Sequence, residues 1–187
     1  MKYNISLFGL IVIVFYLLSG FVMQQAALAS NFLTYDNHAL GIRILYPADW
    51  EKRDSKDIAR SFGQQIGVTF NSPLENEFDM FSENLFVGGS VVENLSLPEF
   101  AISTIYSLEE SPDINFVNSS STTLAGIPAY TVKYFFSKPI VPEDLLVTQI
   151  WTVKDDKLYS IVFTAQPDKF DDYEPVIQRM INSLEID

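Results

Sequence analysis

Residues 145–165 read LLVTQIWTVKDDKLYSIVFTA and carry the strongest structural signal in the chain. Two runs rich in β-branched and aromatic residues flank the polar turn Lys154-Asp155-Asp156-Lys157, a pattern typical of a β-hairpin. Apolar residues occupy both alternating registers of each run, so both faces of the strands must be covered. The stretch therefore predicts two central antiparallel strands in a sheet with a layer on each face.

Two segments are expected to supply those layers as helices. Ser96-Leu97-Pro98-Glu99 has the pattern of a capping box, and apolar residues at helical spacing follow it as far as Ser111-Pro112. Near the C-terminus, Asp172 to Leu184 again spaces its apolar residues along one helix face, with Asp172 as the expected cap. One helix on each face of the sheet gives an α/β/α sandwich.

Further strands are expected to extend the sheet. They lie at Asn31 to Asp36, Gly41 to Tyr46, Ile66 to Phe70, Leu85 to Val92, Ile114 to Thr123 and Ile127 to Phe136. The polar residues from Glu51 to Gln65 are expected to form an exposed connection, and Gly88-Gly89 to mark a bulge or a close backbone approach. The predicted fold class is α+β, with a central antiparallel sheet of about six to eight strands flanked by two main helices.

The first 30 residues differ from the rest of the chain. No residue between Lys2 and Asp36 is charged, and residues 6–23 form an apolar run close to the length of a membrane span. Ala27-Leu28-Ala29 before Ser30 fits a signal-peptidase site. Residues 1–29 are thus expected to be a cleaved signal peptide or an uncleaved N-terminal anchor, the only expected contact with a membrane. Residues 30–187 are expected to form a single extracytoplasmic domain.

Composition excludes several classes of function. The chain has no cysteine, which removes disulfides, thiol nucleophiles, thiolate zinc sites and an N-terminal lipid-modified cysteine. Its 12 Lys and Arg against 24 Asp and Glu give a net charge of −12, so we expect no nucleic-acid partner. Because His38 is the only histidine and no Gly-x-Ser-x-Gly motif is present, we also expect no enzymatic activity.

Two groups of side chains are candidate cation ligands. Asp36 and His38 share a predicted turn, where zinc or manganese would need further ligands from elsewhere. Asp171 and Asp172 belong to an acidic run whose oxygens suit calcium, the only cofactor that the sequence suggests. The alternative for both groups is structural, because Asp, Asn and His are common in turns and acidic residues favour helix N-termini.

A partner-binding surface is expected after the second strand. Trp50 follows Pro47 in a predicted loop, where an exposed indole would anchor a protein partner. The cations of the segment that follows belong to the same surface: Lys52, Arg53, Lys56 and Arg60.

Short motifs distributed along the chain form a further pattern. They are Thr34-Tyr35, GIRILYPADW (residues 41–50), VTFNSP (68–73), SLPEF (96–100), LAGIPA (124–129), KLYSIVFTA (157–165) and Asn182-Ser183-Leu184. Together they resemble the PsbP family, the extrinsic luminal proteins of the photosystem II oxygen-evolving complex and their paralogues. The resemblance covers nearly all of residues 32–186 and implies the PsbP-type α/β/α sandwich, an exported location and a non-enzymatic binding or assembly role.

The chain departs from this family in two respects. It lacks the N-terminal cysteine of lipoprotein-like bacterial members, and it is acidic where members that dock on the photosystem resemble basic-patch binders. The leading hypothesis is a non-catalytic exported domain that binds or helps assemble a membrane-associated protein complex, in photosynthetic relatives the oxygen-evolving complex of photosystem II. The alternative is an extracytoplasmic domain, unrelated to photosynthesis, that binds a small ligand or a divalent cation such as calcium.

Overall fold

The computed structural model describes residues 31–187 except 61, 62, 93 and 138–143, and it gives the backbone without side chains for residues 55–60 and 63–65. The predicted signal peptide or anchor, residues 1–29, lies outside the described residues. None of the described helices is long and apolar enough to cross a membrane.

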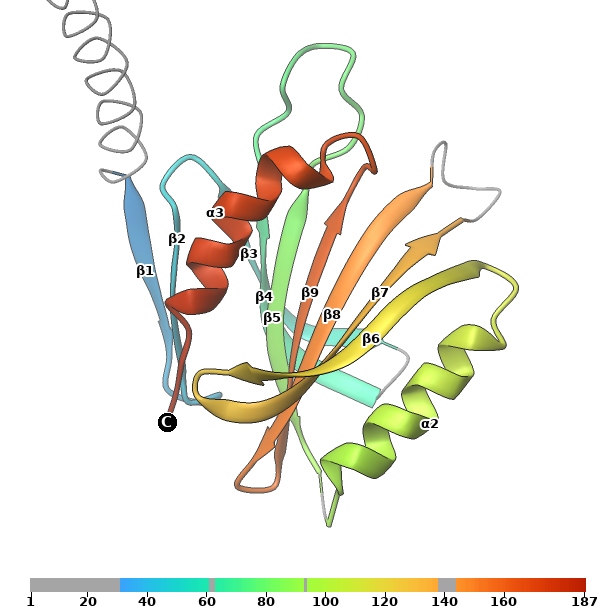
Figure 1. The fold of residues 1–187 in the computed structure, drawn as a ribbon. Helices are drawn as coiled ribbons and strands as arrows, with labels where there is room; N and C mark the ends of the chain where they lie inside the picture. The colour runs from blue at the N-terminus through green and yellow to red at the C-terminus, as the bar shows by residue number, and fades with distance from the viewer. Residues whose placement is uncertain (1–30, 61–62, 93, 138–143) are drawn as a thin grey trace, which may run out of the picture.

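Seven antiparallel strands form the main sheet, in the order β3-β4-β5-β9-β8-β7-β6 (Figure 1). Their bounds are Glu51–Arg60 (β3), Gly63–Asn71 (β4), Asn84–Val91 (β5), Ile114–Leu124 (β6), Ile127–Phe136 (β7), Leu145–Lys154 (β8) and Lys157–Ala165 (β9). The hairpin predicted from residues 145–165 is confirmed as β8–β9, with Asp155 and Asp156 both at positive φ in the turn. The hairpin lies inside the sheet, where both of its faces are covered. This agrees with the apolar residues on both faces of its strands.

One prediction from the sequence is wrong, because residues 51–65 are not an exposed connection. Residues 51–60 form the edge strand β3, which pairs with β4. The charges at residues 51–54 obscure the strand pattern, since an edge strand commonly carries charged side chains that discourage pairing with other chains. A bulge between Ser55 and Ile58 interrupts the register of β3 against β4.

Different layers cover the two faces of the main sheet. One layer consists of α3 (Phe170–Asn182) and a small sheet in the order β1-β2-β10, with bounds Phe32–Asn37 (β1), Ile42–Pro47 (β2) and Glu185–Ile186 (β10). The other layer is α2 (Leu97–Glu109), which lies against β6, β7 and β8 (Figure 1). The predicted sandwich with one helix on each face is therefore confirmed.

Each face of the sheet has its own core. On the α3 face, Phe70 is buried together with Ile177 and Met180 of the helix. On the α2 face, the rings of Trp151 and Phe100 meet edge-on, with centroids 5.6 Å apart. The chain therefore has two cores on either side of the sheet, each built around an aromatic pair or cluster.

The helix starts differ in detail from the prediction. α2 begins directly after Ser96 as expected, but the Ser96 side chain does not make the capping hydrogen bond that the capping box predicts. α3 begins at Phe170, before the predicted cap Asp172. The Phe170 ring is buried, with its centroid 4.7 Å from that of Phe163 in β9, and this packing carries the helix start toward the sheet.

Candidate functional site

The structure separates the predicted cation ligands. His38 in the β1–β2 turn places its Nδ1 3.5 Å from Oδ1 of Asp36, which lies in β1, whereas Asp171 and Asp172 occupy the first turn of α3. Asp36 also pairs with Arg43 at 3.0 Å. Within the described part of the chain, no three histidine, aspartate or glutamate side chains are grouped so that they could hold a metal ion. Calcium binding remains an untested prediction, and no geometry of the described residues favours it.

Trp50 is not an exposed anchor, and that prediction is wrong. Its side chain is only 7% exposed, and its ring lies 6.1 Å from the ring of Tyr173 in α3. The Trp50 amide donates a hydrogen bond to the Pro47 carbonyl at 3.1 Å, which closes a tight turn. This turn directs the indole into the core between β2 and α3.

The predicted cationic surface lies along β3: Lys52, Arg53, Lys56 and Arg60. The first two of these side chains are exposed and paired within their own strand, Lys52 with Asp54 and Arg53 with Glu51, each at 2.7 Å. The side chains of the other two lie outside the described part of the chain. Since each described cation is matched by a carboxylate, this part of β3 carries little net positive charge.

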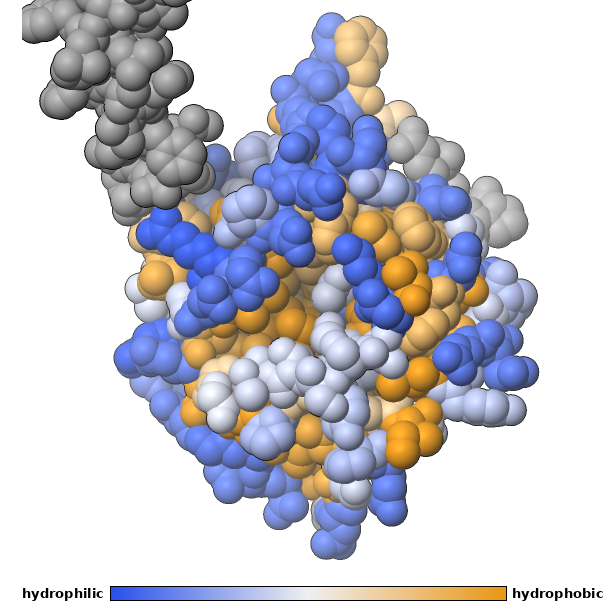
Figure 2. Space-filling view, viewed as in Figure 1, coloured by the Kyte–Doolittle hydropathy of each residue, from blue (hydrophilic) through white to orange (hydrophobic). Residues whose placement is uncertain are grey.

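A groove of about 400 Å³ separates α3 from the β6–β7 hairpin. Figure 2 shows it as an apolar hollow between the hydrophilic helix and the paler hairpin. The sheet contributes Ile150 and Phe163 to it, together with threonine hydroxyls. Glu174 is the single ionisable side chain among the described residues that line the groove, so it offers no acid and base pair.

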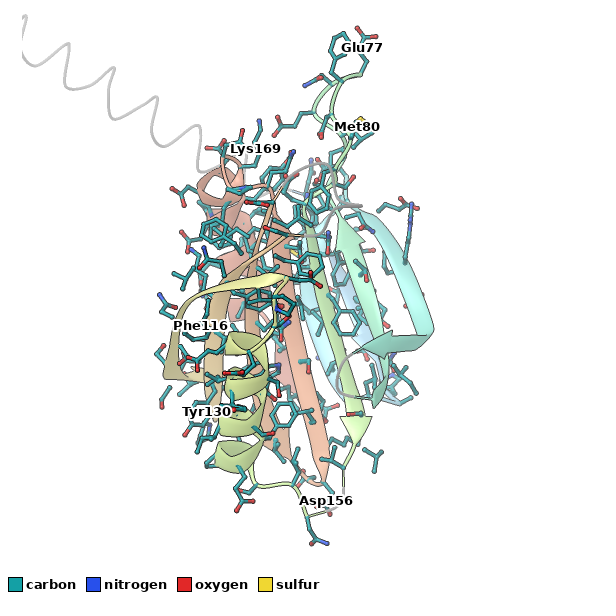
Figure 3. The ribbon with its side chains drawn as sticks, turned by 90° about the vertical axis from the view of Figure 1, so that its right-hand side faces the viewer. Glu77, Met80, Phe116, Tyr130, Asp156 and Lys169 are labelled. Atoms are coloured by element: carbon teal, nitrogen blue, oxygen red, sulfur yellow. The ribbon has the colours of Figure 1, made fainter. Side chains whose placement is uncertain are left out.

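The two most exposed large apolar side chains among the described residues lie in the β4–β5 loop (residues 72–83). Phe78 is 82% exposed, Met80 is 87% exposed, and Leu74 is also exposed. The loop projects beyond the ends of the strands, with Met80 and Glu77 on the projecting part (Figure 3). Burying a side chain such as Phe or Met is worth about 1.5–3 kcal/mol, so a group of them left in water indicates a contact surface.

Polar side chains fix the shape of this loop. The Asp79 carboxylate accepts hydrogen bonds from the backbone amides of Glu75 at 2.8 Å and Phe81 at 3.1 Å, and these bonds lower the pKa of Asp79. Asn76 Oδ1 accepts a hydrogen bond from the Phe78 amide at 2.9 Å. The loop thus turns a carboxylate inward and presents Phe78 to solvent in a defined backbone conformation.

The start of α3 holds the base of the loop. The Lys169 ammonium pairs with the Glu75 carboxylate, and this hydrogen bond raises the pKa of Lys169. The Tyr173 hydroxyl donates to Glu75 Oε1 at 3.4 Å, and the Ser72 amide donates to the Glu83 carbonyl at 2.8 Å. We call this part of the domain, residues 72–83 with the first turn of α3, the loop end.

A buried carboxyl group lies at the base of the loop. Glu83 is 1% exposed, and the Ser72 hydroxyl donates to its Oε2 at 3.4 Å while its Oε1 has no hydrogen-bond partner. Burial raises the pKa of Glu83, and the Asp79 charge raises it further, against opposing hydrogen bonds from backbone amides. The sequence could not single out this residue, because Glu83 is one of many acidic residues whose burial depends on the strands around it.

Glu83→Gln is expected to flatten the pH dependence of stability. The raised pKa means that the folded chain binds a proton more tightly than the unfolded chain. The contribution of Glu83 to stability is therefore largest at low pH and is lost as the pH rises from the ordinary pKa of the carboxyl through its raised value. Thermal unfolding between pH 4.5 and pH 8 should show this decline in the parent and a weaker one in Glu83→Gln. Glu77→Gln, an exposed change in the same loop, should behave as the parent, and parallel curves for all three proteins would contradict the assignment.

Comparison with known proteins defines the family. The family model described as PsbP-like protein matches residues 21–186, which is most of the chain. The chain belongs to the PsbP-like family. This confirms the resemblance inferred from the sequence motifs. Comparison of this PsbP-like chain with the curated proteins gives no match.

Solved structures share the fold of this PsbP-like domain at low identity. Cyanobacterial PsbP (CyanoP) from Synechocystis sp. PCC 6803 is 18% identical, with a TM-score of 0.59 over 84% of this chain and 94% of that chain. LpqN, involved in cell envelope biogenesis of Mycobacterium tuberculosis, is 14% identical, with a TM-score of 0.56 over 83% and 90%. A Pseudomonas aeruginosa protein of unknown function, a putative regulator, is 12% identical, with a TM-score of 0.54 over 80% and 93%. The fold thus occurs in proteins with different roles.

Proposed function

We propose that this PsbP-like protein is an exported, non-enzymatic domain that binds or helps assemble a membrane-associated protein complex through its loop end. The observation that carries the proposal is the pair of nearly fully exposed side chains, Phe78 and Met80, on a loop whose shape is fixed by hydrogen bonds. Such anchors contribute most of the binding energy when they enter pockets on a partner. In photosynthetic relatives the complex would be the oxygen-evolving complex of photosystem II.

The course of the chain supports a location of the loop end near the membrane. β1 starts at the same end of the domain as the β4–β5 loop (Figure 1). Seven residues, 24–30, separate the apolar run of residues 6–23 from the first described residue, and they span at most about 25 Å when extended. During export, or permanently if the segment is not cleaved, the loop end would therefore lie close to the bilayer and to proteins embedded in it.

Two of the grooves between described residues have linings that support a non-enzymatic role. The groove beside α3 contains one ionisable side chain, Glu174, among the described residues that line it. A second cleft, between α2 and the sheet, contains one among its described lining residues, the phenol of Tyr134. General acid–base or nucleophilic catalysis needs at least two cooperating groups within hydrogen-bond reach, and neither groove supplies them.

Site-specific crosslinking tests the proposal. The photoreactive residue p-benzoylphenylalanine is placed at Phe78 in the full tagged chain, expressed in the source organism. The control carries it at Val91, which is 78% exposed at the far end of β5. Irradiation is expected to join the first variant, and not the second, to a membrane protein identified by mass spectrometry. Equal crosslinking from both positions, or none from either, would overturn the proposal.

Charged substitutions at the same positions give a second test. Phe78→Asp/Met80→Asp is expected to weaken the binding of the purified chain to membranes isolated from the source organism by about 30-fold or more, because two anchors of about 1–2 kcal/mol each are lost. Val91→Asp should bind as the parent does. The variants should keep the parent's melting temperature within a few degrees, since the side chains that change are exposed.

A further inference from the structure

We infer that the surface recognised by the loop end is a cationic protein surface, in which lysine or arginine side chains surround an apolar pocket. The inference rests on the proposed function and names the chemistry of its partner. It is argued from the charges on the loop and at its base, together with the two apolar anchors.

Exposed carboxylates lie on the loop and at its base. Asp171 and Asp172 are exposed in the first turn of α3, and the Lys169–Glu75 contact places that turn beside the loop. Asp168 and Asp172 are close enough to Lys169 to raise its pKa through their charges, after the larger effect of Glu75. Glu77 projects with Met80 on the outer part of the loop (Figure 3).

The cations described near these carboxylates are already engaged. Lys169 pairs with Glu75, and the Lys133 ammonium lies 3.8 Å from the centroid of the Phe170 ring, at the start of α3. The loop end therefore combines apolar anchors with an excess of negative charge. A cationic rim on the partner would be complementary to it, and such complementarity speeds association and fixes orientation.

The same charges disfavour a lipid surface as the occupant. A bilayer that contains anionic lipids attracts basic segments and repels acidic ones. Insertion of Phe78 and Met80 into such a surface would bring Glu77, on the same projecting part of the loop, against the headgroups. A protein with a basic surface gains from the carboxylates of the loop end, so it is the occupant that the structure favours.

The partner would meet a surface that needs little ordering. Asp79 and Asn76 hold the loop backbone, and Lys169 and Tyr173 hold its base. A preorganised loop loses little conformational entropy on binding. The apolar anchors then determine the lifetime of the complex, while the carboxylates determine how quickly it forms.

Neutralising substitutions test the charge complementarity. The variant Glu77→Gln/Asp171→Asn/Asp172→Asn removes three carboxylates from the loop end. Its control, Asp155→Asn/Asp156→Asn, removes two from the β8–β9 turn at the opposite end of the domain (Figure 3), where asparagine also tolerates positive φ. Binding of both purified full-length variants to membranes isolated from the source organism is measured at 25 mM and 300 mM salt.

The loop-end variant is expected to associate about tenfold more slowly than the parent at 25 mM salt and to lose most of this difference at 300 mM. The turn variant should match the parent at both salt concentrations. The peptide crosslinked from position 78 should carry lysine or arginine next to apolar residues. An unchanged association rate in the loop-end variant, or an acidic crosslinked peptide, would overturn the inference.

The outcomes separate this inference from the proposed function. If Phe78→Asp/Met80→Asp loses binding while the neutralised variant binds normally, the loop end is the docking surface and its partner is not cationic. If both variants bind as the parent, the proposed function fails as well. Equal binding of the parent to protein-free vesicles of phosphatidylcholine and phosphatidylglycerol and to native membranes would identify a lipid occupant and overturn the inference.

Discussion

Phe70→Ala is expected to lower the free energy of unfolding by about 4 kcal/mol. Phe70 in β4 is 0% exposed, its ring stacks on that of Tyr46 with centroids 4.7 Å apart, and it meets Tyr35 edge-on at 5.9 Å. The ring therefore joins the β1–β2 hairpin to the main sheet. Truncation leaves a cavity between the two, because neither tyrosine can move into the space without losing its own contacts.

Denaturant unfolding followed by circular dichroism measures this loss. Ile66→Ala is the matched control, since Ile66 lies in the same strand with half of its surface exposed and should cost less than about 1.5 kcal/mol. Hydrogen exchange should show that the amides of β1 and β2 lose protection first in Phe70→Ala. A loss as small as that of the control would mean that the hairpin is held to the sheet by other contacts.

Gly88→Ala is expected to destabilise the fold by about 3 kcal/mol through overpacking. A Cβ atom at this position would lie 2.4 Å from Cζ of Phe86 and 2.7 Å from the Ile66 carbonyl oxygen. Gly67, directly opposite in β4, lies under the same ring. The Phe86 ring thus rests on the two glycines, and the sequence expectation of a close backbone approach at Gly88-Gly89 is confirmed.

A double-mutant cycle separates the ring from the backbone in this effect. In a Phe86→Ala background, Gly88→Ala should lower the free energy of unfolding clearly less than it does in the parent, because the ring no longer meets the new methyl group. Part of the cost should remain, since the contact with the Ile66 carbonyl is unaffected. Equal costs in the two backgrounds, measured by denaturant unfolding, would show that the ring moves aside freely.

The architecture was largely accessible from the sequence, because the signals that define it are local. The two-residue turn at Asp155-Asp156 and the alternating apolar runs around it predict a hairpin without reference to any other part of the chain. Apolar residues in both registers required two covering layers, and two segments with helical periodicity were available to form them. The strand β3 escaped detection because residues 51–54 are charged, as an edge strand permits.

The candidate site was largely inaccessible from the sequence. Trp50 was expected at the surface, yet the turn after Pro47 and the position of Tyr173, far along the chain, bury it. In the sequence, the acidic residues around Glu75 form only a charged cluster. In the structure, Glu75 pairs with Lys169, Asp79 turns into the loop and Glu83 is buried beneath it. These positions depend on α3, whose Tyr173 is separated from Glu75 by 98 positions in the sequence.

The sequence by itself determined the PsbP-like family, the order of most elements and the two-layered covering of the sheet, because these follow from periodicity and from motifs spread along the chain. Only the tertiary structure decided which side chains remain exposed. Burial depends on the sum of contacts from segments that are distant in sequence. The pattern that places Phe70 in a strand does not show that two tyrosines enclose it, and the sequence around Phe78 does not show that its side chain is left in water. The surface proposed to bind a partner therefore became visible only once β4, β5 and α3 had been brought together.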